Sequence, residues 1–158
     1  MREILFRGKR CDNGEWVQGF YVRADHHWHK NGIHKDWIAL GASANGGWFA
    51  LHNKYAVKAE TAGQYTGLTD KNGKKIFEGD IVNAVIVRDL GGGTENRKET
   101  GIISYDKIGM IGLITEYAGT IPVWSDFFQE LTLSGCINDF WFEVIGNIHD
   151  NPELLENP

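Results

Sequence analysis

Cysteine is scarce in this chain of 158 residues, which carries only Cys11 and Cys136. A small secreted domain held together by disulfides would carry more cysteines, so we expect two free thiols in a reducing compartment. The sequence also lacks any apolar run of about 18 residues, and its first residues contain no apolar stretch of the length of a signal peptide. These absences exclude a membrane-spanning helix and favour a cytoplasmic protein.

Positive charge is in the minority, because 16 Lys and Arg residues face 21 Asp and Glu residues and the net charge is −5. An acidic protein repels phosphate backbones, so the composition disfavours non-specific binding to nucleic acid. Two short basic clusters oppose this trend, one at residues 7–10 and the other at Lys71, Lys74 and Lys75. They leave nucleic acid open as an alternative partner.

Proline is rare, with 3 residues, whereas glycine is frequent with 20 and aromatic residues make up 12% of the chain. This composition is typical of a sheet protein with many tight turns. Four Asn-Gly pairs, each a strong signal for a two-residue turn, predict hairpins rather than crossover helices. No segment keeps helical periodicity over more than about three turns, so we predict a mostly β fold.

Alternating apolar and polar residues predict antiparallel strands in an N-terminal region, residues 1–62, and further strands in a second region, residues 63–158. Strands are expected at residues 4–6, 16–22, 37–40, 48–51, 55–59, 80–88, 101–105, 110–117 and 140–148, and polar loops or turns at 23–36, 41–47, 52–54 and 90–97. Residues 121–134 fit a helix as well as a strand. Near the C-terminus, Asn151 is expected to cap a short helical turn that begins at Pro152.

The segment Gln64–Val82 predicts a hairpin, a short connector and the start of a buried strand. Asn72 and Gly73 form its turn signal, because both tolerate the positive φ that a type I′ turn requires. Asp80 stands where a strand begins, a position at which a carboxylate commonly accepts hydrogen bonds from backbone N–H groups. We interpret this segment as scaffold rather than as a catalytic site.

Three blocks carry a family resemblance in their order and spacing. They are Arg2–Arg10 followed by Asp12–Val17, then Gln64–Val82, and finally Glu143–Leu154. Together they resemble the YopX family of phage and prophage proteins over essentially the full chain. The resemblance implies a small cytoplasmic protein encoded by a mobile element, with a mostly β fold. It implies no established reaction, so it supplies no catalytic residues.

The strand order after Glu78 suits a small, strongly bent barrel of the SH3-like kind, on which the N-terminal strands pack as a second sheet. We expect residues 64–82 to contact residues 143–154, because pairing the first and last strands would close the barrel. Four apolar side chains of these blocks are then predicted to be largely buried, namely Ile81, Val82, Val144 and Ile148.

Candidate functional residues gather in the polar segment 26–34. The imidazoles of His27 and His29, with His34 and the neighbouring His26, form a candidate metal site, and the alternative is a solvated loop. Trp28 within this segment, together with the turn lysines Lys71, Lys74 and Lys75, forms a candidate interaction surface. The glycines of Leu90–Thr94 lack the Lys-Ser/Thr pair of a phosphate-binding loop.

The sequence favours a non-catalytic accessory protein that binds a protein partner, because it contains no nucleophile with a base and no cofactor motif. A nucleic-acid-binding small barrel is the first alternative. A metal-dependent enzyme using the histidines of residues 26–34 is the second. Exposed N-terminal strands with nearby tryptophans further predict a homo-oligomer. No cofactor is expected.

Overall fold

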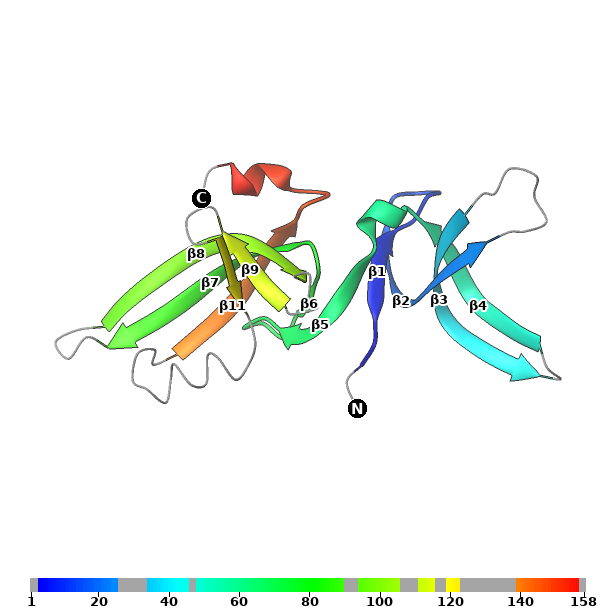
Figure 1. The fold of residues 1–158 in the computed structure, drawn as a ribbon, viewed down its shortest axis with the longest axis horizontal. Coiled ribbons are helices and arrows are strands. Elements are labelled where there is room, and N and C mark those ends of the chain that lie inside the picture. Colours follow the sequence, from blue (N-terminus) through cyan, green and yellow to red (C-terminus); the bar gives the residue numbers. More distant parts are fainter. Residues whose placement is uncertain are drawn as a thin grey trace. The chain divides into compact units, whose positions relative to one another are not determined.

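The computed structural model describes residues 3–25, 34–45, 48–89, 94–105, 111–115, 119–122 and 139–156. The chain is mostly antiparallel β structure and divides into two compact units, residues 1–65 and 66–158 (Figure 1). The first unit contains β1 (Phe6–Lys9), β2 (Trp16–Asp25), β3 (His34–Asn45), β4 (Trp48–Val57), the 3-10 helix η1 (Ala59–Thr61) and the start of β5 (Gly63–Thr69). The second contains the rest of β5, β6 (Lys75–Phe77), β7 (Asp80–Asp89), β8 (Thr94–Tyr105), β9 (Ile111–Thr115), β10 (Gly119–Pro122), β11 (Asp139–Asn147) and the 3-10 helix η2 (Pro152–Leu155).

The sheet of the first unit has the strand order β4-β3-β2-β1-β5. The predicted N-terminal hairpin is confirmed, since β1 and β2 pair from Lys9 opposite Trp16 to Phe6 opposite Gly19. Alternate residues of a strand point to opposite faces, and directly opposed residues of neighbouring strands share a face. The inward face holds the fully buried Ile38 and the nearly buried Val57. These residues form the core of this unit.

The two ends of this set of strands meet beyond Lys9. Arg10 bridges Val57, Cys11 N–H donates to Ala56 O at 2.8 Å, and Lys58 N–H donates to Lys9 O at 2.9 Å. The end of β4 is therefore fixed to the chain that leaves β1, which bends the sheet around its buried face. Cys11 itself is an exposed free thiol, and Cys136 lies outside the described residues.

β4 corrects one sequence expectation. Its residues run as a single strand from Trp48 to Val57, whereas the sequence indicated a turn at residues 52–54 between two strands. The register with β3 stays constant on both sides of Asn53, which has a φ of 48°. The polar residues therefore mark a local irregularity in a continuous strand. The expected loops at 41–47 and 90–97 are also partly strand, since β3 reaches Asn45 and β8 begins at Thr94.

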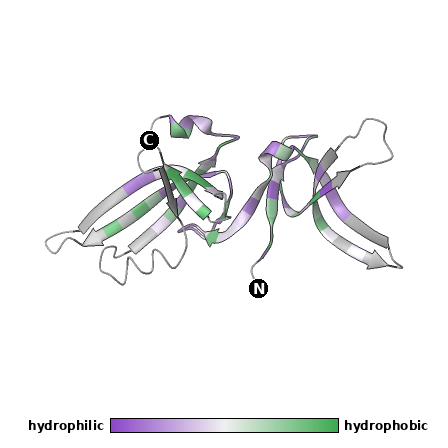
Figure 2. Cartoon of the chain, viewed as in Figure 1, coloured by the Kyte–Doolittle hydropathy of each residue, from purple (hydrophilic) through white to green (hydrophobic). Residues whose placement is uncertain are grey.

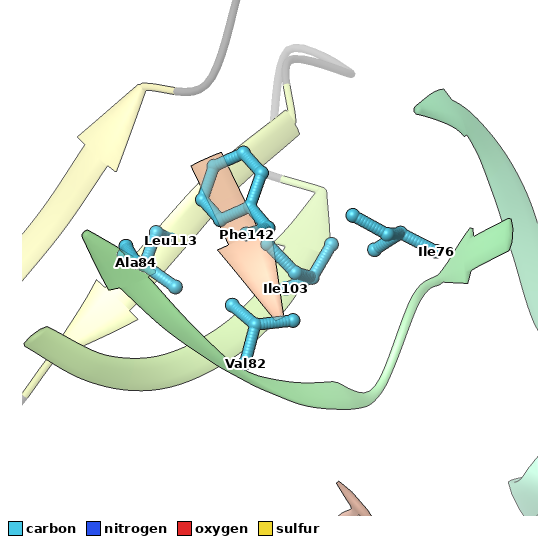
Figure 3. Packing of buried hydrophobic residues seen from close by; sticks show 6 residues of the cluster. All are labelled: Ile76, Val82, Ala84, Ile103, Leu113 and Phe142. Carbon is cyan, nitrogen blue, oxygen red and sulfur yellow. The ribbon is translucent and has the colours of Figure 1, made fainter. Parts of the chain in front are cut away.

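The second unit contains a five-stranded sheet with the order β10-β9-β8-β7-β11. Figure 2 shows hydrophobic residues along β7 and β9. A cluster of buried side chains from four of these strands and from β6 forms its core (Figure 3). Its members are Ile76, Val82, Ala84, Ile103, Leu113 and Phe142. Because Ile76 comes from β6, the β5–β6 hairpin contributes to the same core.

The predicted contact between the second and third sequence blocks is confirmed by the pairing of β7 with β11. Ile81 and Val82 are fully buried as expected, and Val144 is partly buried against the core. The prediction that Ile148 is largely buried is wrong, because this residue lies beyond the end of β11 and is 36% exposed beside Gly79. The closed SH3-like barrel is not confirmed, because the described sheet ends at β10 on one side and β11 on the other.

The hairpin between β5 and β6 is confirmed, but its predicted turn type is wrong. Gly73 N–H donates to Asp70 O at 2.9 Å, and Asp70 N–H donates to Lys74 O at 2.8 Å. Gly73 has a φ of 79°, whereas Asn72 has no positive φ. This pattern is a type I turn followed by a left-handed glycine, the usual form of a three-residue hairpin loop.

The C-terminal helical turn is present as η2, with Pro152 in its first position. Asn151 occupies the expected N-cap position, although its side chain makes no capping hydrogen bond. None of the helices in the described ranges is long and apolar enough to cross a membrane.

Candidate functional site

Most of the predicted metal site lies outside the described residues. This holds for His26, His27 and His29, and also for Trp28 of the predicted interaction surface. His34 begins β3 opposite Asp25. The described part of the chain contains no group of three His, Cys, Asp or Glu side chains that could hold a metal ion. The histidine site therefore stays a prediction.

The turn lysines lie on the β5–β6 hairpin. Lys71 and Lys74 are exposed in the turn, and Lys75 is half-buried at the start of β6. The Lys71 ammonium lies 3.0 Å from a carboxylate oxygen of Glu143, whose side chain is 39% exposed. One positive charge of this cluster is therefore matched by a neighbouring negative charge, which weakens its attraction for an anion.

The buried carboxylates of the second unit hold backbone groups in place. Asp80, which is 1% exposed, accepts a hydrogen bond from Phe77 N–H at 2.8 Å, as its place in the sequence predicted. Asp70, 6% exposed, accepts hydrogen bonds from the N–H groups of Asn72, Lys74 and Val144. Both acids stabilise connections between strands, so their geometry is that of scaffold residues.

The outward face of the first unit's sheet brings aromatic and cationic side chains together. We call it the aromatic face and define it by Arg7, Lys9, Trp16, Gln18, Phe20, Val22, Trp37 and Lys54. Its cross-strand neighbours follow from the register, which places Lys9 opposite Trp16 and Arg7 opposite Gln18. The same register forms the rows Phe20–Ala39–Lys54 and Val22–Trp37–Ala56.

Cations lie over two indole rings of the aromatic face. The Arg7 guanidinium carbon is 4.8 Å from the ring centroid of Trp16, and the Lys9 nitrogen is 5.8 Å from it. The Lys54 nitrogen is 5.1 Å from the ring centroid of Trp37. These distances are within the range of cation–π attraction, so each contact restrains both the ring and the charge.

Phe20 lies between these two tryptophan sites along β2. Its side chain is 55% exposed, although it stands within a ten-residue strand. The neighbouring Ala39 is fully buried, so the sheet beneath the ring is covered while the ring itself meets solvent. Trp16 and Trp37 are half-buried. The face therefore presents three aromatic side chains on rigid strands.

Arg10 is separated from the other two cations of its sequence cluster. Its guanidinium lies 4.3 Å from the ring centroid of Tyr55 and forms two hydrogen bonds to Asp12. The hydrogen bond to Asp12 raises the pKa of Arg10, and the same bond lowers the pKa of Asp12. Arg10 thus belongs to an ion pair at the hairpin loop, whereas Arg7 and Lys9 belong to the aromatic face.

Sequence reasoning identified parts of this face but did not bring them together. It placed Trp16, Gln18, Phe20 and Val22 on one side of a strand, which the register confirms. It treated Arg7 and Lys9 as part of a basic turn that left nucleic acid open as a partner, and it gave no strand register that would place Trp37 or Lys54 beside them. Only the register of β2, β3 and β4 supplies that juxtaposition.

The fold and the aromatic face define a class of two-unit, mostly β protein with an aromatic and cationic sheet surface. The chain matches the YopX protein family over residues 5–156 and belongs to that family. The YopX family comprises uncharacterised proteins, so membership confirms the resemblance without adding a reaction. A comparison with curated proteins found no match.

Among solved structures, the chain is similar to protein EF1440 from Enterococcus faecalis. The two chains share 23% sequence identity and superpose with a TM-score of 0.47. The alignment covers 98% of this chain and 99% of the other.

Proposed function

We propose that the protein is a non-catalytic binding module that engages its ligand through the aromatic face. The observation that carries this proposal is that Phe20 is 55% exposed although it stands within a strand, and that the half-buried Trp16 and Trp37 lie on the same face. Single exposed apolar residues are common on protein surfaces, but grouped ones mark interaction sites. Tryptophan, which this face carries at Trp16 and Trp37, is also among the residue types enriched where binding energy concentrates.

The rigidity of the face supports the same function. Its side chains stand on four paired strands, β1 to β4, and cations restrain the rings of Trp16 and Trp37. A ligand that docks on restrained side chains loses less conformational entropy to ordering than one that docks on mobile loops. The buried acids Asp70 and Asp80 act as scaffold, which agrees with a binding role rather than a catalytic one.

Site-specific photocrosslinking tests this function in the cells that produce the protein. A photoreactive phenylalanine analogue at Phe20 is expected to crosslink the intact chain to a macromolecule. The matched control places the same analogue at Lys74, which is exposed on the β5–β6 turn of the other unit. Equal crosslinking at both positions, or none at Phe20, would contradict a ligand on the aromatic face. Treating the product with nuclease or protease identifies the class of the captured molecule.

Several finer expectations from the sequence remain proposals. They are a phage or prophage origin, a cytoplasmic location, a homo-oligomeric state and an SH3-like character for the second unit. Sedimentation equilibrium decides the oligomeric state, and a monomer at micromolar concentration would refute it. The sequence favoured a protein partner, whereas the charges around the aromatic face support nucleic acid as the ligand.

A further inference from the structure

We propose that the aromatic face binds single-stranded nucleic acid. This inference rests on the proposed binding function and names the ligand class for the same site. Nucleic-acid strands combine regularly spaced negative charges with flat rings, and the face combines cations with aromatic side chains. Base stacking on aromatic residues and phosphate attraction to lysine and arginine are the two contributions from which non-sequence-specific strand binding is built.

Charge is distributed unequally between the two units. Residues 1–65 contain nine Lys and Arg residues and six Asp and Glu residues, a formal charge of +3. Residues 66–158 contain seven and fifteen, a formal charge of −8, and together the units give the −5 of the whole chain. A charge asymmetry of this kind is a sequence sign of a polyanion-binding part. The aromatic face lies on the positive unit.

The face itself is positive at its described positions. Arg7, Lys9 and Lys54 point outward from β1 and β4, as their contacts with outward indole rings require. Among the outward strand positions whose side chains the structure describes, none is acidic. A polyanion on this face would therefore meet the exposed Lys54 and the half-buried Lys9, whereas Arg7 is only 9% exposed and acts through its contact with Trp16.

The spacing of the rings suits several nucleotides. Trp37 lies opposite Val22, which is six residues after Trp16 on β2. At 3.3 Å per residue, the two tryptophan positions are therefore about 20 Å apart along the strand. Phe20 lies between them. Bases in a duplex are stacked on one another and hide their faces, whereas a single strand can turn them onto aromatic side chains. The three rings therefore favour a single strand over a duplex.

Fluorescence anisotropy with labelled oligonucleotides tests the inference on the full chain. The probes are a deoxythymidine and a uridine oligomer of about ten nucleotides each, and a duplex of the same length, at salt concentrations from about 50 to 300 mM. We expect both single strands to bind more tightly than the duplex. If Lys9 and Lys54 contact phosphates, the logarithm of affinity should fall against that of salt with a slope of about −1.4. A difference in affinity between the deoxythymidine and uridine oligomers would identify DNA or RNA as the preferred ligand.

Two surface substitutions localise the binding. Phe20→Ala should weaken it about 5- to 150-fold, the range for one stacked base. Lys54→Gln should reduce the salt slope by about 0.7. The matched controls are Leu40→Ala and Lys74→Gln. Leu40 is 50% exposed and follows Ala39 on β3, so it points away from the aromatic face, and Lys74 belongs to the other unit. Both controls should bind like the unchanged protein, and urea unfolding verifies that every variant is folded.

Different results overturn different conclusions. Absence of oligonucleotide binding at the lowest salt, equal binding of the duplex, or affinities unchanged by both Phe20→Ala and Lys54→Gln would overturn the inference. If the photocrosslink at Phe20 captured a protein in the same series, the binding function would stand while its nucleic-acid ligand would fall. If Phe20 captured nothing and no oligonucleotide bound, both would fall.

Discussion

Asp70 provides the sharpest test of how the second unit is held together. Its Oδ1 accepts hydrogen bonds from Asn72 N–H at 2.8 Å and Lys74 N–H at 2.9 Å, and its Oδ2 accepts one from Val144 N–H at 3.3 Å. The carboxylate therefore closes the β5–β6 turn and joins it to β11. Replacing Asp70 with Ala removes all three interactions at once.

The expected loss follows from the geometry. A hydrogen bond to a charged group contributes about 1.5–3 kcal/mol, but the amides of the exposed Asn72 and Lys74 regain water when the acceptor is lost. The bond from Val144 is longer than the usual range of about 2.7–3.2 Å and contributes less. We expect Asp70→Ala to lower the free energy of unfolding by about 2–4 kcal/mol. Asp70→Asn keeps one acceptor for the turn and should lose about 1–2 kcal/mol.

The effect should depend on pH in a defined direction. Burial alone would raise the pKa of Asp70, but the N–H groups of Lys74, Asn72 and Val144 hold it below its ordinary value. Because the pKa is lower in the folded state, ionised Asp70 stabilises the fold at pH values above the unfolded pKa of about 3.9. That contribution is lost as the pH falls through the folded pKa. The gap between the unchanged protein and Asp70→Asn should therefore shrink in acid.

Urea unfolding followed by tryptophan fluorescence measures both effects, at neutral pH and in acid. Amide exchange at Val144 gives a local reading if the two units unfold in separate steps. The matched control is Asp12→Asn, which removes an exposed carboxylate from a loop and should leave the urea midpoint nearly unchanged. A loss below about 0.5 kcal/mol for Asp70→Ala would refute the reasoning, because it would show that water replaces the carboxylate at no cost.

Three further perturbations test other parts of the fold. Ile81→Ala should lower the free energy of unfolding by about 2–5 kcal/mol because the side chain is fully buried, and a urea-measured loss below about 1 kcal/mol would remove Ile81 from the core. Gly79→Ala should lower the free energy of unfolding by about 1–2 kcal/mol because Gly79 has a φ of 80°. Gly41→Ala is the control, because the space around that site is open, and equal urea midpoints for the two variants would contradict the expectation. The pKa of Tyr21 is raised because its hydroxyl donates to Asp36 and the side chain is partly buried. The Tyr21 phenol should therefore ionise above its ordinary pKa in an ultraviolet titration, and Tyr21→Phe should remove that signal. This bond stabilises the fold below pH ~10 and is lost as the pH rises through the folded pKa of Tyr21, so a Tyr21→Phe variant with unchanged stability at neutral pH would argue against it.

Turn residues in the sequence predicted where a turn occurs better than they predicted its backbone type. Asn72 and Gly73 marked the β5–β6 turn correctly, because few other residues favour that combination of polarity and backbone freedom. The turn is nevertheless type I, and the Asp70 side chain explains why. Its Oδ1 binds the amides of Asn72 and Lys74 and so stabilises the wider loop. A side chain two residues before the turn signal thus decided the geometry.

Long-range pairing was predictable where both partners were strongly apolar. The contact of β7 with β11 followed from two apolar blocks that each required a partner. The same reasoning failed for Ile148, because hydrophobicity does not reveal where a strand ends and the chain turns outward. The sequence also did not reveal that β4 continues through the polar residues 52–54, because His52 and Lys54 are held in the strand by pairing with β3 rather than by their own preferences.

The candidate site shows why a whole-chain charge was a weak guide to partners. At physiological salt, exposed charges act over a Debye length of about 8 Å, so a ligand on one face responds mainly to the side chains near it. The net charge of −5 is the sum of a positive and a much more negative unit, and it disfavoured nucleic acid only as an average. Arg7, Lys9 and Lys54 are brought together by the register of β1–β4, which no count of residues contains. The salt slope of oligonucleotide binding therefore distinguishes local charge from average charge. A slope near −1.4 that becomes shallower with Lys54→Gln would show that the local charges of the face decide binding, whereas no binding at low salt would show that the average charge decides it.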